Sequence, residues 1–579
     1  MNVLAFVGLP LLLLLIPIIA FLIKIYSGKS INNPKYPPVL GTVFHQLLYF
    51  NRLYDHQTEA ARKHSTFRLL APGQSQIYTT DLQNIEHVLK TNFDKYAKGE
   101  CNQDVFRDLF GTGIFAVDGD KWRQQRKVAS FEFSTRVLRD FSCTVFRRNA
   151  IKLVRKVEEY SLGNQVFDMQ DLLMRSTLES IFKVGFGVDL NCIEGEGQGS
   201  SKEESIMFMK AFDDSNELTY WRYVDPFWTL KRYFNIGSEA SLRKNIKIIH
   251  DFVDKLITAR RKQLDSDVKS EKEDILSRFI RESKKDPETM TDEYLRDIIL
   301  NFVIAGKDSS ANTLSWFFYM LCKNPLVGEK LDREIEEVFG NLKEKASSSV
   351  EDCIASITDD EVLQKMPYLH ATLTETLRLY PAVPIDGRCA ETDDVLPDGF
   401  KVKKGDGVYY MSYAMGRMPY IWGDDAEEFR PERWLKDGIF TPESPFKFTA
   451  FHLPTHNLLL PITAFHRAEI TERNPVKNTM IHPPSNTPLL YYSGSNRTSH
   501  FIMQQSLESP GINSTEELEP RSTIENAFVG SALQLFNQRS RKVRFVKLLN
   551  PCRLESLFAD AERKPVFYLS AALGRRKGS

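Results

Sequence analysis

Apolar residues dominate the stretch from Leu295 to Cys322, and a polar notch, Ala305-Gly306-Lys307-Asp308-Ser309-Ser310, interrupts it near the middle. Thr291 is a suitable N-cap and Pro325 lies just beyond the far end, so the pattern predicts a single helix of roughly 30 residues, about 45 Å long. With so little polar surface, this helix should be buried on most sides. A glycine in a helix interior costs about 1 kcal/mol against alanine, and a buried carboxylate must be paired or hydrated. The notch is therefore either a packing kink with Asp308 bonded locally or a functional feature.

Upstream of this helix, the pattern indicates helices with a few short strands. Alternation of apolar and polar residues predicts strands at Phe67 to Leu70 and at Ile77 to Thr79, next to an amphipathic helix from Phe50 to His64. The pattern of residues 81–302 is mainly helical, apart from a turn-rich insert at 194–201. The heavily charged segment 266–285 is expected to form a solvated helical face.

Downstream of the notched helix, further helices are expected around residues 325–339 and within 359–380. Short strands and turns should then occupy residues 381–410, with Pro397-Asp398-Gly399 as a turn. The predicted fold class is therefore mainly α with a small β lobe (α+β).

The N-terminal residues have the pattern of a membrane anchor. Val3 to Ile23 is an uncharged run long enough to span a bilayer, broken only by two prolines. A cleaved signal peptide fits less well, because no basic region precedes the run and no small-residue cleavage site follows it. Lysines follow the run, which places the N-terminus in the lumen and the body in the cytosol. Residues 1–26 are thus predicted to be a single-pass transmembrane signal anchor in the membrane of the endoplasmic reticulum, in contact with lipid, and residues 27–42 a stiff proline-rich hinge.

Composition excludes several classes of protein. Lysine plus arginine and aspartate plus glutamate each total 76, so no basic excess is present to neutralise phosphates, and we expect no nucleic-acid partner. The 7 cysteines are odd in number and scattered without a CxxC pair, which predicts neither a disulfide scaffold nor a zinc site.

Four groups of residues carry candidate chemistry, and each is weak evidence when taken singly. Glutamate and arginine three residues apart share a helix face and are expected to pair, which on an exposed surface would mean little. In chain order the groups are Trp122 with Arg126; the notch with Gly306, Asp308 and Ser309; Glu375 with Arg378; and Phe429-Arg430-Pro431-Glu432-Arg433-Trp434.

Together, in this order and at this spacing, these motifs resemble the cytochrome P-450 superfamily of haem-thiolate monooxygenases over about Pro34 to His452. The chain looks most like the plant long-chain fatty-acid ω-hydroxylase clan, judged from the notch, from Thr374-Glu375-Thr376-Leu377-Arg378-Leu379-Tyr380-Pro381 and from Phe446-Lys447-Phe448-Thr449-Ala450-Phe451-His452. The resemblance implies a cytochrome P-450 fold over residues 43–452, a haem cofactor, and electrons from NADPH through a flavin-containing cytochrome P-450 reductase. It also implies that one oxygen atom of dioxygen is inserted into a C–H bond of a fatty-acid-like substrate.

The resemblance also implies a role for each group of residues. Asp308 and Ser309 would relay protons to iron-bound dioxygen, and Gly306 would open the helix for the oxygen. Trp122, Arg126 and Arg388 would bind the haem propionates, for which the fixed fork of arginine is suited. The charged side chains Glu375, Arg378 and Arg433 would form a buried structural triad behind the haem.

The resemblance fails at the loop that should supply the iron ligand. The family pattern Phe-x-x-Gly-x-Arg-x-Cys-x-Gly should begin at Phe451, but Leu458 occupies the cysteine position. Leucine has no lone pair to give, and the missing thiolate both holds the iron and favours cleavage of the dioxygen bond. His456 and Cys552 are the remaining candidates for a metal ligand, although a surface histidine is the commoner case and Cys552 lacks the flanking glycines and arginine. The sequence therefore predicts no metal ligand at the expected position.

The residues after this break have a different character. Residues 453–579 contain scattered prolines in polar sequence and are expected to form a divergent, poorly ordered tail. The abrupt change after His452 indicates an altered exon end, a retained intron or a shifted reading frame. The sequence thus predicts a membrane-bound fatty-acid hydroxylase impaired by loss of its axial cysteine. The alternative is a catalytically inert variant that acts as a binding or regulatory protein or does not fold stably.

Overall fold

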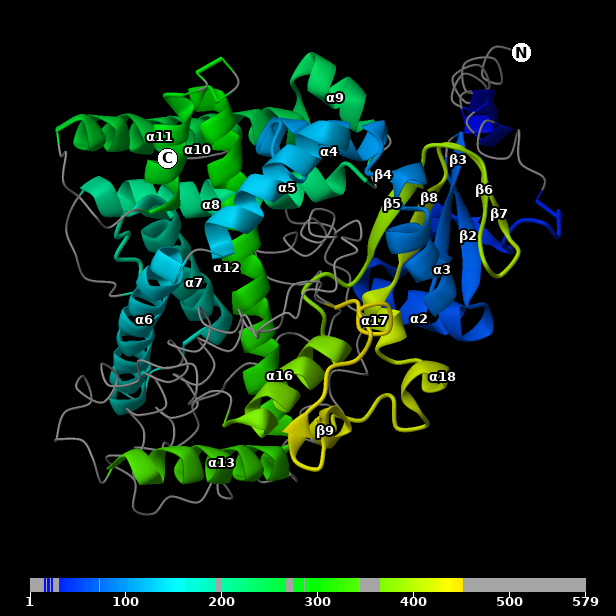
Figure 1. Cartoon of the computed structure of the whole chain (residues 1–579). Helices are drawn as coiled ribbons and strands as arrows, with labels where there is room; N and C mark the ends of the chain where they lie inside the picture. Colours follow the sequence, from blue (N-terminus) through cyan, green and yellow to red (C-terminus); the bar gives the residue numbers. More distant parts are fainter. Residues whose placement is uncertain are drawn as a thin grey trace, which may run out of the picture.

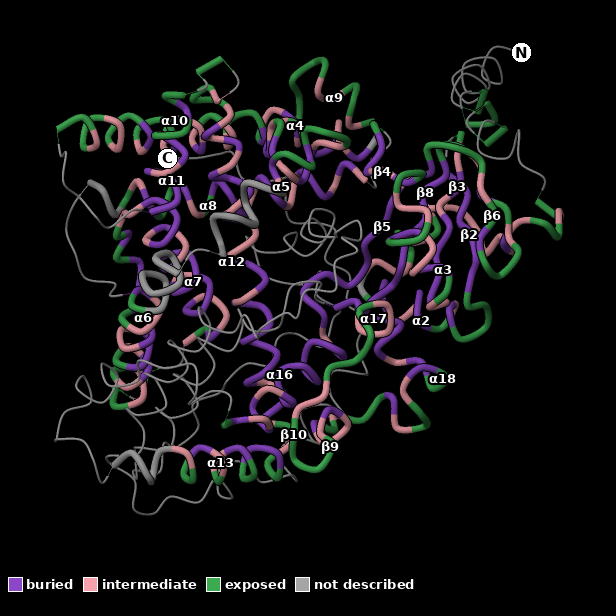
Figure 2. The backbone as a smooth tube through the Cα atoms, in the orientation of Figure 1, coloured by how far each residue is buried: buried purple, intermediate pink, exposed green. Residues whose placement is uncertain are grey.

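A long central helix, α12 (Asp292–Lys323), organises the helical part of the protein (Figure 1). The computed structural model describes residues 31–450, except 72, 135, 164, 166, 194–199, 224, 226, 267–273, 286, 289 and 344–364, and also residues 15, 16, 18–20, 22 and 23. The predicted start of α12 is confirmed, because the Thr291 hydroxyl accepts a hydrogen bond from the Tyr294 N–H at 3.2 Å. Figure 2 shows the helix buried along most of its length, as its apolar pattern predicts.

The helices around α12 form two apolar clusters that share it. One joins it to α6, α7, α13 and α16, and the other joins it to α4, α7, α8, α10 and α11. Of the remaining helices, α9 packs on α10, α5 packs on α6, and α17 packs on α2. The bounds of all these helices are α2 (Leu53–Lys63), α3 (Leu82–Glu86), α4 (Glu100–Phe110), α5 (Gly119–Ser134), α6 (Arg136–Leu162), α7 (Met169–Phe186), α8 (Ser200–Trp221), α9 (Trp228–Phe234), α10 (Gly237–Ser266), α11 (Ile275–Ser283), α13 (Pro325–Lys343), α16 (Pro367–Leu379), α17 (Ser412–Met415) and α18 (Pro419–Trp422).

The strands form one six-stranded mixed sheet, in the order β1-β2-β3-β8-β5-β4, and two small pairs, β6-β7 and β9-β10. The two strands predicted from alternation are confirmed as β2 and β3, which pair antiparallel. β3 also pairs in parallel with β8, so that Ile77 lies opposite Val408. The bounds are β1 (Val39–Thr42), β2 (Thr66–Ala71), β3 (Gln74–Thr79), β4 (Tyr96–Ala97), β5 (Asp386–Ala390), β6 (Asp394–Val395), β7 (Lys401–Val402), β8 (Gly407–Tyr410), β9 (Leu435–Lys436) and β10 (Ile439–Phe440). The prediction of a mainly helical chain with a small β lobe is thus confirmed.

One predicted surface helix is a core helix. α11 lies in the charged segment that was expected to be a solvated face, but Ile275, Leu276, Phe279 and Ile280 are buried in the cluster around α12. Their spacing places them on one side of the helix, while charged residues occupy the other side. The prediction was wrong because overall charge hides a narrow apolar stripe in a short helix.

The described part of the proline-rich segment contacts the sheet. The Arg68 guanidinium donates to the Pro37 carbonyl at 2.8 Å, and β1 pairs in parallel with β2. Most of the predicted anchor, 1–26, and the whole predicted tail, 453–579, lie outside the described residues. Among the helical residues that are described, none form a stretch long and apolar enough to cross a membrane.

Candidate functional site

The glycine of the notch allows α12 and α7 to approach closely. A Cβ atom at Gly306 would lie 2.8 Å from the Cδ1 atom of Ile181 on α7, inside van der Waals contact. α12 remains helical through this position. The glycine therefore fits a close contact between the two helices.

The acid and the hydroxyl of the notch are both buried, and both bond within their own helix. The Ser309 hydroxyl donates to the Ala305 carbonyl at 2.9 Å. Asp308 Oδ1 accepts a hydrogen bond from Lys307 Nζ at 2.8 Å. Oδ2 of Asp308 is buried and has no hydrogen-bond partner among the described residues. One carboxylate oxygen of Asp308 is thus held by a hydrogen bond, and the other has none from the described residues.

Lys307 was missed by the sequence analysis, although a lysine inside an apolar helix was a signal. Its side chain is only 1% exposed, and its Nζ also donates to Asp213 of α8 at 2.5 Å. Burial alone would lower the pKa of Lys307, but the two carboxylates outweigh it and raise the pKa above its ordinary value. The lysine is therefore charged and links α12 to α8.

The structure places the three members of the predicted charged triad together. Arg378 Nε donates to Glu375 Oε2 at 2.7 Å, and its Nη2 donates to Oε1 at 2.8 Å. Arg433 Nε donates to Glu375 Oε1 at 2.9 Å. The spacing of Glu375 and Arg378 predicted their shared face, whereas the approach of Arg433 depends on the fold.

Further donors and acceptors complete the triad and tie α16 to the following loop. Glu375 also accepts from the Arg430 N–H at 2.8 Å and from the Trp434 indole N–H at 2.9 Å. Arg378 donates to the carbonyls of Ala426 and Glu428. Every partner is needed, because a buried charge without hydrogen bonds is strongly unfavourable.

The residues predicted to bind propionates come from two elements that meet at Phe93. Trp122 of α5 is buried, its ring centroid lies 5.8 Å from that of Phe93, and its indole N–H has no acceptor among the described residues. The guanidinium of Arg388, on β5, lies over the Phe93 ring, 5.6 Å from its centroid. Arg126, one turn after Trp122, is half-buried. A buried N–H donor and an arginine from distant segments thus gather in one place.

Lys98 joins this group, and no sequence motif pointed to it. Its Nζ lies 5.4 Å from the centroid of the Trp122 ring and donates to the Val117 carbonyl at 2.6 Å. Burial and then the positive charge of Arg388 lower the pKa of Lys98 to about 7, although Asp118 acts in the opposite direction. Lys98 already has one anionic neighbour, Asp118, 3.6 Å from its Nζ, and a further anion beside Lys98 and Arg388 would favour the charged form of the lysine.

Polar residues in the first half of α12 hold the loop that leads to α5. Asp297 Oδ2 accepts from the Thr112 N–H at 2.7 Å, and Asn301 Oδ1 accepts from the Phe115 N–H at 3.1 Å. A Cβ atom at Gly113 would lie 2.0 Å from Asn301 Nδ2, so only glycine permits this approach. The loop thereby fixes the start of the helix that bears Trp122.

Asp297 should contribute to the pH dependence of stability, because burial raises its pKa to about 6 from 3.8. Between these values the folded state keeps a proton that the unfolded chain has released, so stability should fall as the pH rises through this window. The expected loss is on the order of 3 kcal/mol. We expect Asp297→Asn to flatten the change of the thermal unfolding midpoint between about pH 4 and pH 7. Glu288→Gln, at an exposed acid in the turn before α12, is the control; an unchanged slope in Asp297→Asn would contradict this assignment.

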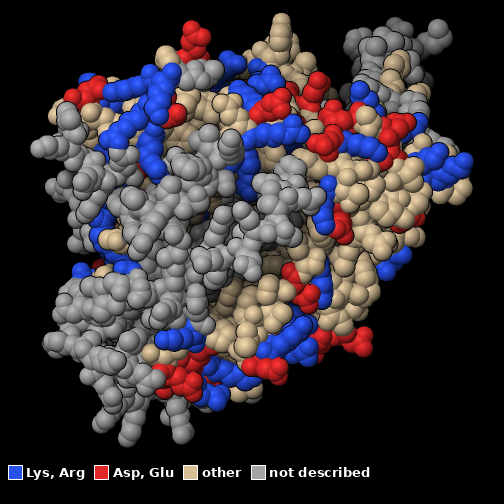
Figure 3. Space-filling model, in the orientation of Figure 1, with Lys and Arg blue, Asp and Glu red and all other residues tan. Residues whose placement is uncertain are grey.

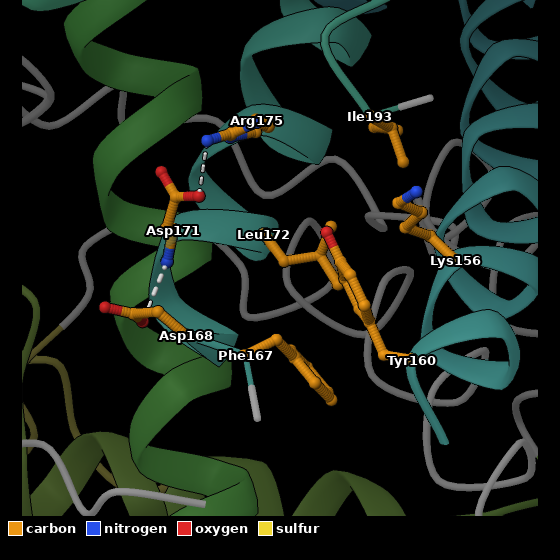
Figure 4. A pocket seen from close by; sticks show the side chains of 8 residues that line it. All are labelled: Lys156, Tyr160, Phe167, Asp168, Asp171, Leu172, Arg175 and Ile193. Carbon is orange, nitrogen blue, oxygen red and sulfur yellow. Dashed lines mark hydrogen bonds and ion pairs between the residues drawn. The ribbon is translucent and has the colours of Figure 1, made fainter. Parts of the chain in front are cut away.

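A surface pocket of about 230 Å³ lies between α6 and α7 (Figure 4). Lys156 and Tyr160 come from α6, while Asp171 and Arg175 come from α7 and pair with each other at 2.8 Å. None of the site residues predicted from the sequence lines this pocket. Its wall mixes charges of both signs with apolar side chains, so we assign no chemistry to it.

Charge is mixed on the described part of the face in Figure 3, where basic and acidic side chains are interspersed.

The expected ligand position, Leu458, and the two candidate iron ligands, His456 and Cys552, lie outside the described residues. The site residues that the structure does describe fall into three groups. These are the α12 notch, the cluster of donors around Phe93 (Trp122, Arg126 and Arg388), and the triad at Glu375.

Comparison with known proteins gives matches over most of the chain. The family model described as Cytochrome P450 matches residues 34–452. Cytochrome P450 704C1 of Pinus taeda is 52% identical over 422 residues, which cover 72% of this chain and 81% of that protein. Cytochrome P450 704B1 of Arabidopsis thaliana is 41% identical over 494 residues, covering 79% of this chain and 93% of that protein. Cytochrome P450 94A1 of Vicia sativa is 36% identical over 416 residues, covering 71% and 76%.

Proposed function

This chain belongs to the cytochrome P450 family, and from that membership we propose that its body is built to hydroxylate long-chain fatty acids with haem and dioxygen. Membership implies a haem cofactor and a reductase that supplies electrons. We further propose that the electrons come from NADPH through a flavin-containing reductase, and that the reaction inserts one oxygen atom into a C–H bond. Long-chain fatty acid as the substrate rests on the resemblance of the motifs alone.

The observation that supports haem binding is the group of donors around Phe93. A buried indole N–H without an acceptor among the described residues, beside Arg388 and Lys98, suits the carboxylates of haem propionates. Trp122, Arg126 and Arg388 would hold that anionic edge. Haem bound in this way supplies the activation of dioxygen.

The other residues act by holding charge and position. Asp308 and Ser309 present a carboxylate and a hydroxyl at neighbouring positions of one buried helix, where they would hold and pass on a proton. Glu375, Arg378 and Arg433 would keep α16 fixed to the loop of residues 425–434 and so keep the wall of the site in place.

The iron ligand is the part of the site that does not fit. Leu458 stands where the family pattern requires cysteine, and the family match ends at residue 452. This observation favours a second candidate function, a catalytically inert form that acts as a binding or regulatory protein or does not fold stably. For either form we propose an anchor at 1–26 in the endoplasmic reticulum membrane with the body in the cytosol.

The carbon monoxide difference spectrum of the reduced protein tests both proposals. We expect the full chain, expressed in membranes with haem supplied, to give no thiolate-type Soret band. A chimera whose residues 453–579 are replaced by the corresponding C-terminal part of Cytochrome P450 704C1 should give that band. The reason is that the body retains the cluster of donors around Phe93 and the triad at Glu375. A thiolate band from the unmodified chain would mean that a cysteine such as Cys552 reaches the iron. A chimera that binds no haem would overturn the proposed role of the body.

A further inference from the structure

A buried cluster of one cation and two carboxylates joins α12 to α8 beside the proposed proton-handling residues. Lys307 lies between Asp213 and Asp308, at 2.5 Å and 2.8 Å from the nearest oxygen of each. The three side chains are between 1% and 7% exposed, so water screens their charges little. Asp213 and Asp308 come from helices that are far apart in the sequence.

The charges of this cluster do not cancel if all three groups are ionised. One ammonium faces two carboxylates, which leaves a net negative charge in a buried site, and such a charge is unfavourable unless a proton neutralises it. Burial raises the pKa of Asp213 to about 7; Lys307 lowers it, while Asp308 and the neighbouring Asp214 raise it. The cluster therefore retains a proton close to neutral pH.

The geometry restricts Asp308 in a specific way. Lys307 occupies Oδ1 of Asp308, while Oδ2 is buried without a hydrogen-bond partner among the described residues. Lys307 and Asp308 are adjacent on one helix, so their side chains leave the helix in different directions, and an external contact is needed to hold the lysine. Asp213 provides that contact from α8.

We propose that Lys307 and Asp213 are positioning residues for Asp308, holding its carboxylate in one orientation with a single oxygen left for proton exchange. This inference rests on the proposed function, in which Asp308 holds and passes on a proton. An ion pair that only joined two helices would hold α8 to α12 but would have no effect on the pH dependence of the reaction.

The first test measures the proton of Asp213 in the full chain, and it needs no haem. Infrared difference spectroscopy detects the carbonyl stretch of a protonated carboxyl group. Burial also raises the pKa of Asp332 and of Glu334 to about 7, so the wild-type chain should lose several such bands as the pH rises through about 7. The difference between the wild type and Asp213→Asn should isolate one band, which the variant lacks. Glu203→Gln, at an exposed acid of the same helix, is the control and should keep it. The same band in Asp213→Asn would overturn the proposal.

The second test measures the coupling between Lys307 and Asp213. The effect of Lys307→Met on the thermal unfolding midpoint should be smaller in the Asp213→Asn background than in the wild type, because the partner is already lost. Lys307→Arg should restore much of the midpoint. Additive shifts, or equal shifts from the methionine and arginine variants, would mean that the pair is not coupled.

The third test uses the chimera with a restored cysteine loop. Asp213→Asn should lower kcat by about tenfold or more and shift its pH optimum, with KM little changed, while Glu203→Gln, at an exposed acid of α8, leaves all three unchanged. Loss of thermal stability without a change in kcat or in its pH profile would reduce the pair to a structural contact. If Asp308→Asn itself leaves kcat unchanged, the proposed function fails instead, and the infrared and coupling results still stand.

Discussion

Replacing Glu375 with glutamine is expected to lower the free energy of unfolding by about 3–5 kcal/mol, because Arg378 and Arg433 would lose the carboxylate that balances them. Glu375 and Arg378 are 0% exposed, and the Arg433 side chain is 5% exposed, so water cannot replace the lost charge. Asp425 lies 3.4 Å from Arg433, whereas the described partners of Arg378 are Glu375 and backbone carbonyls, so Asp425 compensates one cation at most. The measurement is the urea midpoint of unfolding of the full chain, monitored by intrinsic fluorescence and independently by resistance to limited proteolysis.

Glu427→Gln is the matched control for this change. Glu427 pairs with Arg62 at the surface, where its side chain is 65% exposed, and an exposed pair contributes about 1 kcal/mol at most. A midpoint shift in Glu375→Gln no larger than that of Glu427→Gln would show that the triad does not carry the stability assigned to it. Arg378→Lys adds a second comparison, because lysine keeps the charge but cannot reproduce the forked contact with Glu375.

The second large effect concerns catalysis in the chimera with the restored cysteine loop. Asp308→Asn should lower the rate of fatty-acid hydroxylation by about 100-fold while substrate binding persists, because a positioned acid typically contributes a factor of 10² to 10⁴. Asparagine has nearly the same size and can still accept from Lys307, so the link of Lys307 to Asp213 of α8 is retained. The measurement is product formed per electron pair supplied, together with a spectral titration of substrate binding.

Ser315→Ala provides the control on the same helix. The Ser315 hydroxyl donates to its own helix at the Ala311 carbonyl, as the Ser309 hydroxyl does at Ala305, but it lies outside the notch. This variant should keep the rate of the parent chimera. A rate in Asp308→Asn close to that of Ser315→Ala would contradict the assignment of Asp308 to proton handling.

Local pattern was enough for several parts of the fold. The apolar run and its cap predicted α12, and alternation predicted β2 and β3, because side-chain periodicity depends only on the local backbone. The face shared by Glu375 and Arg378 was predicted for the same reason. The same method failed for α11, where the many charged residues of the segment obscured four apolar residues on one side.

Contacts between distant segments were beyond the reach of the pattern. Nothing in the spacing of residues indicates that Ile77 lies opposite Val408, or that Lys98 lies over the Trp122 ring. The ion pair of Lys307 with Asp213 belongs to the same class, since a lysine in an apolar helix signals a partner without naming it.

The sequence by itself determined which elements form, the order of the family motifs, and the presence of leucine at position 458 where cysteine is expected. These features depend on residue identity and on short-range backbone geometry. The tertiary structure alone decided that Asp213 meets Lys307 and that Lys98 lies over the Trp122 ring. The pairing of Arg433 with Glu375 was implied by the family resemblance, but no local pattern in the chain could show it. The physical reason is that a buried charge must be balanced by whichever group the packing of helices and strands brings within hydrogen-bond distance.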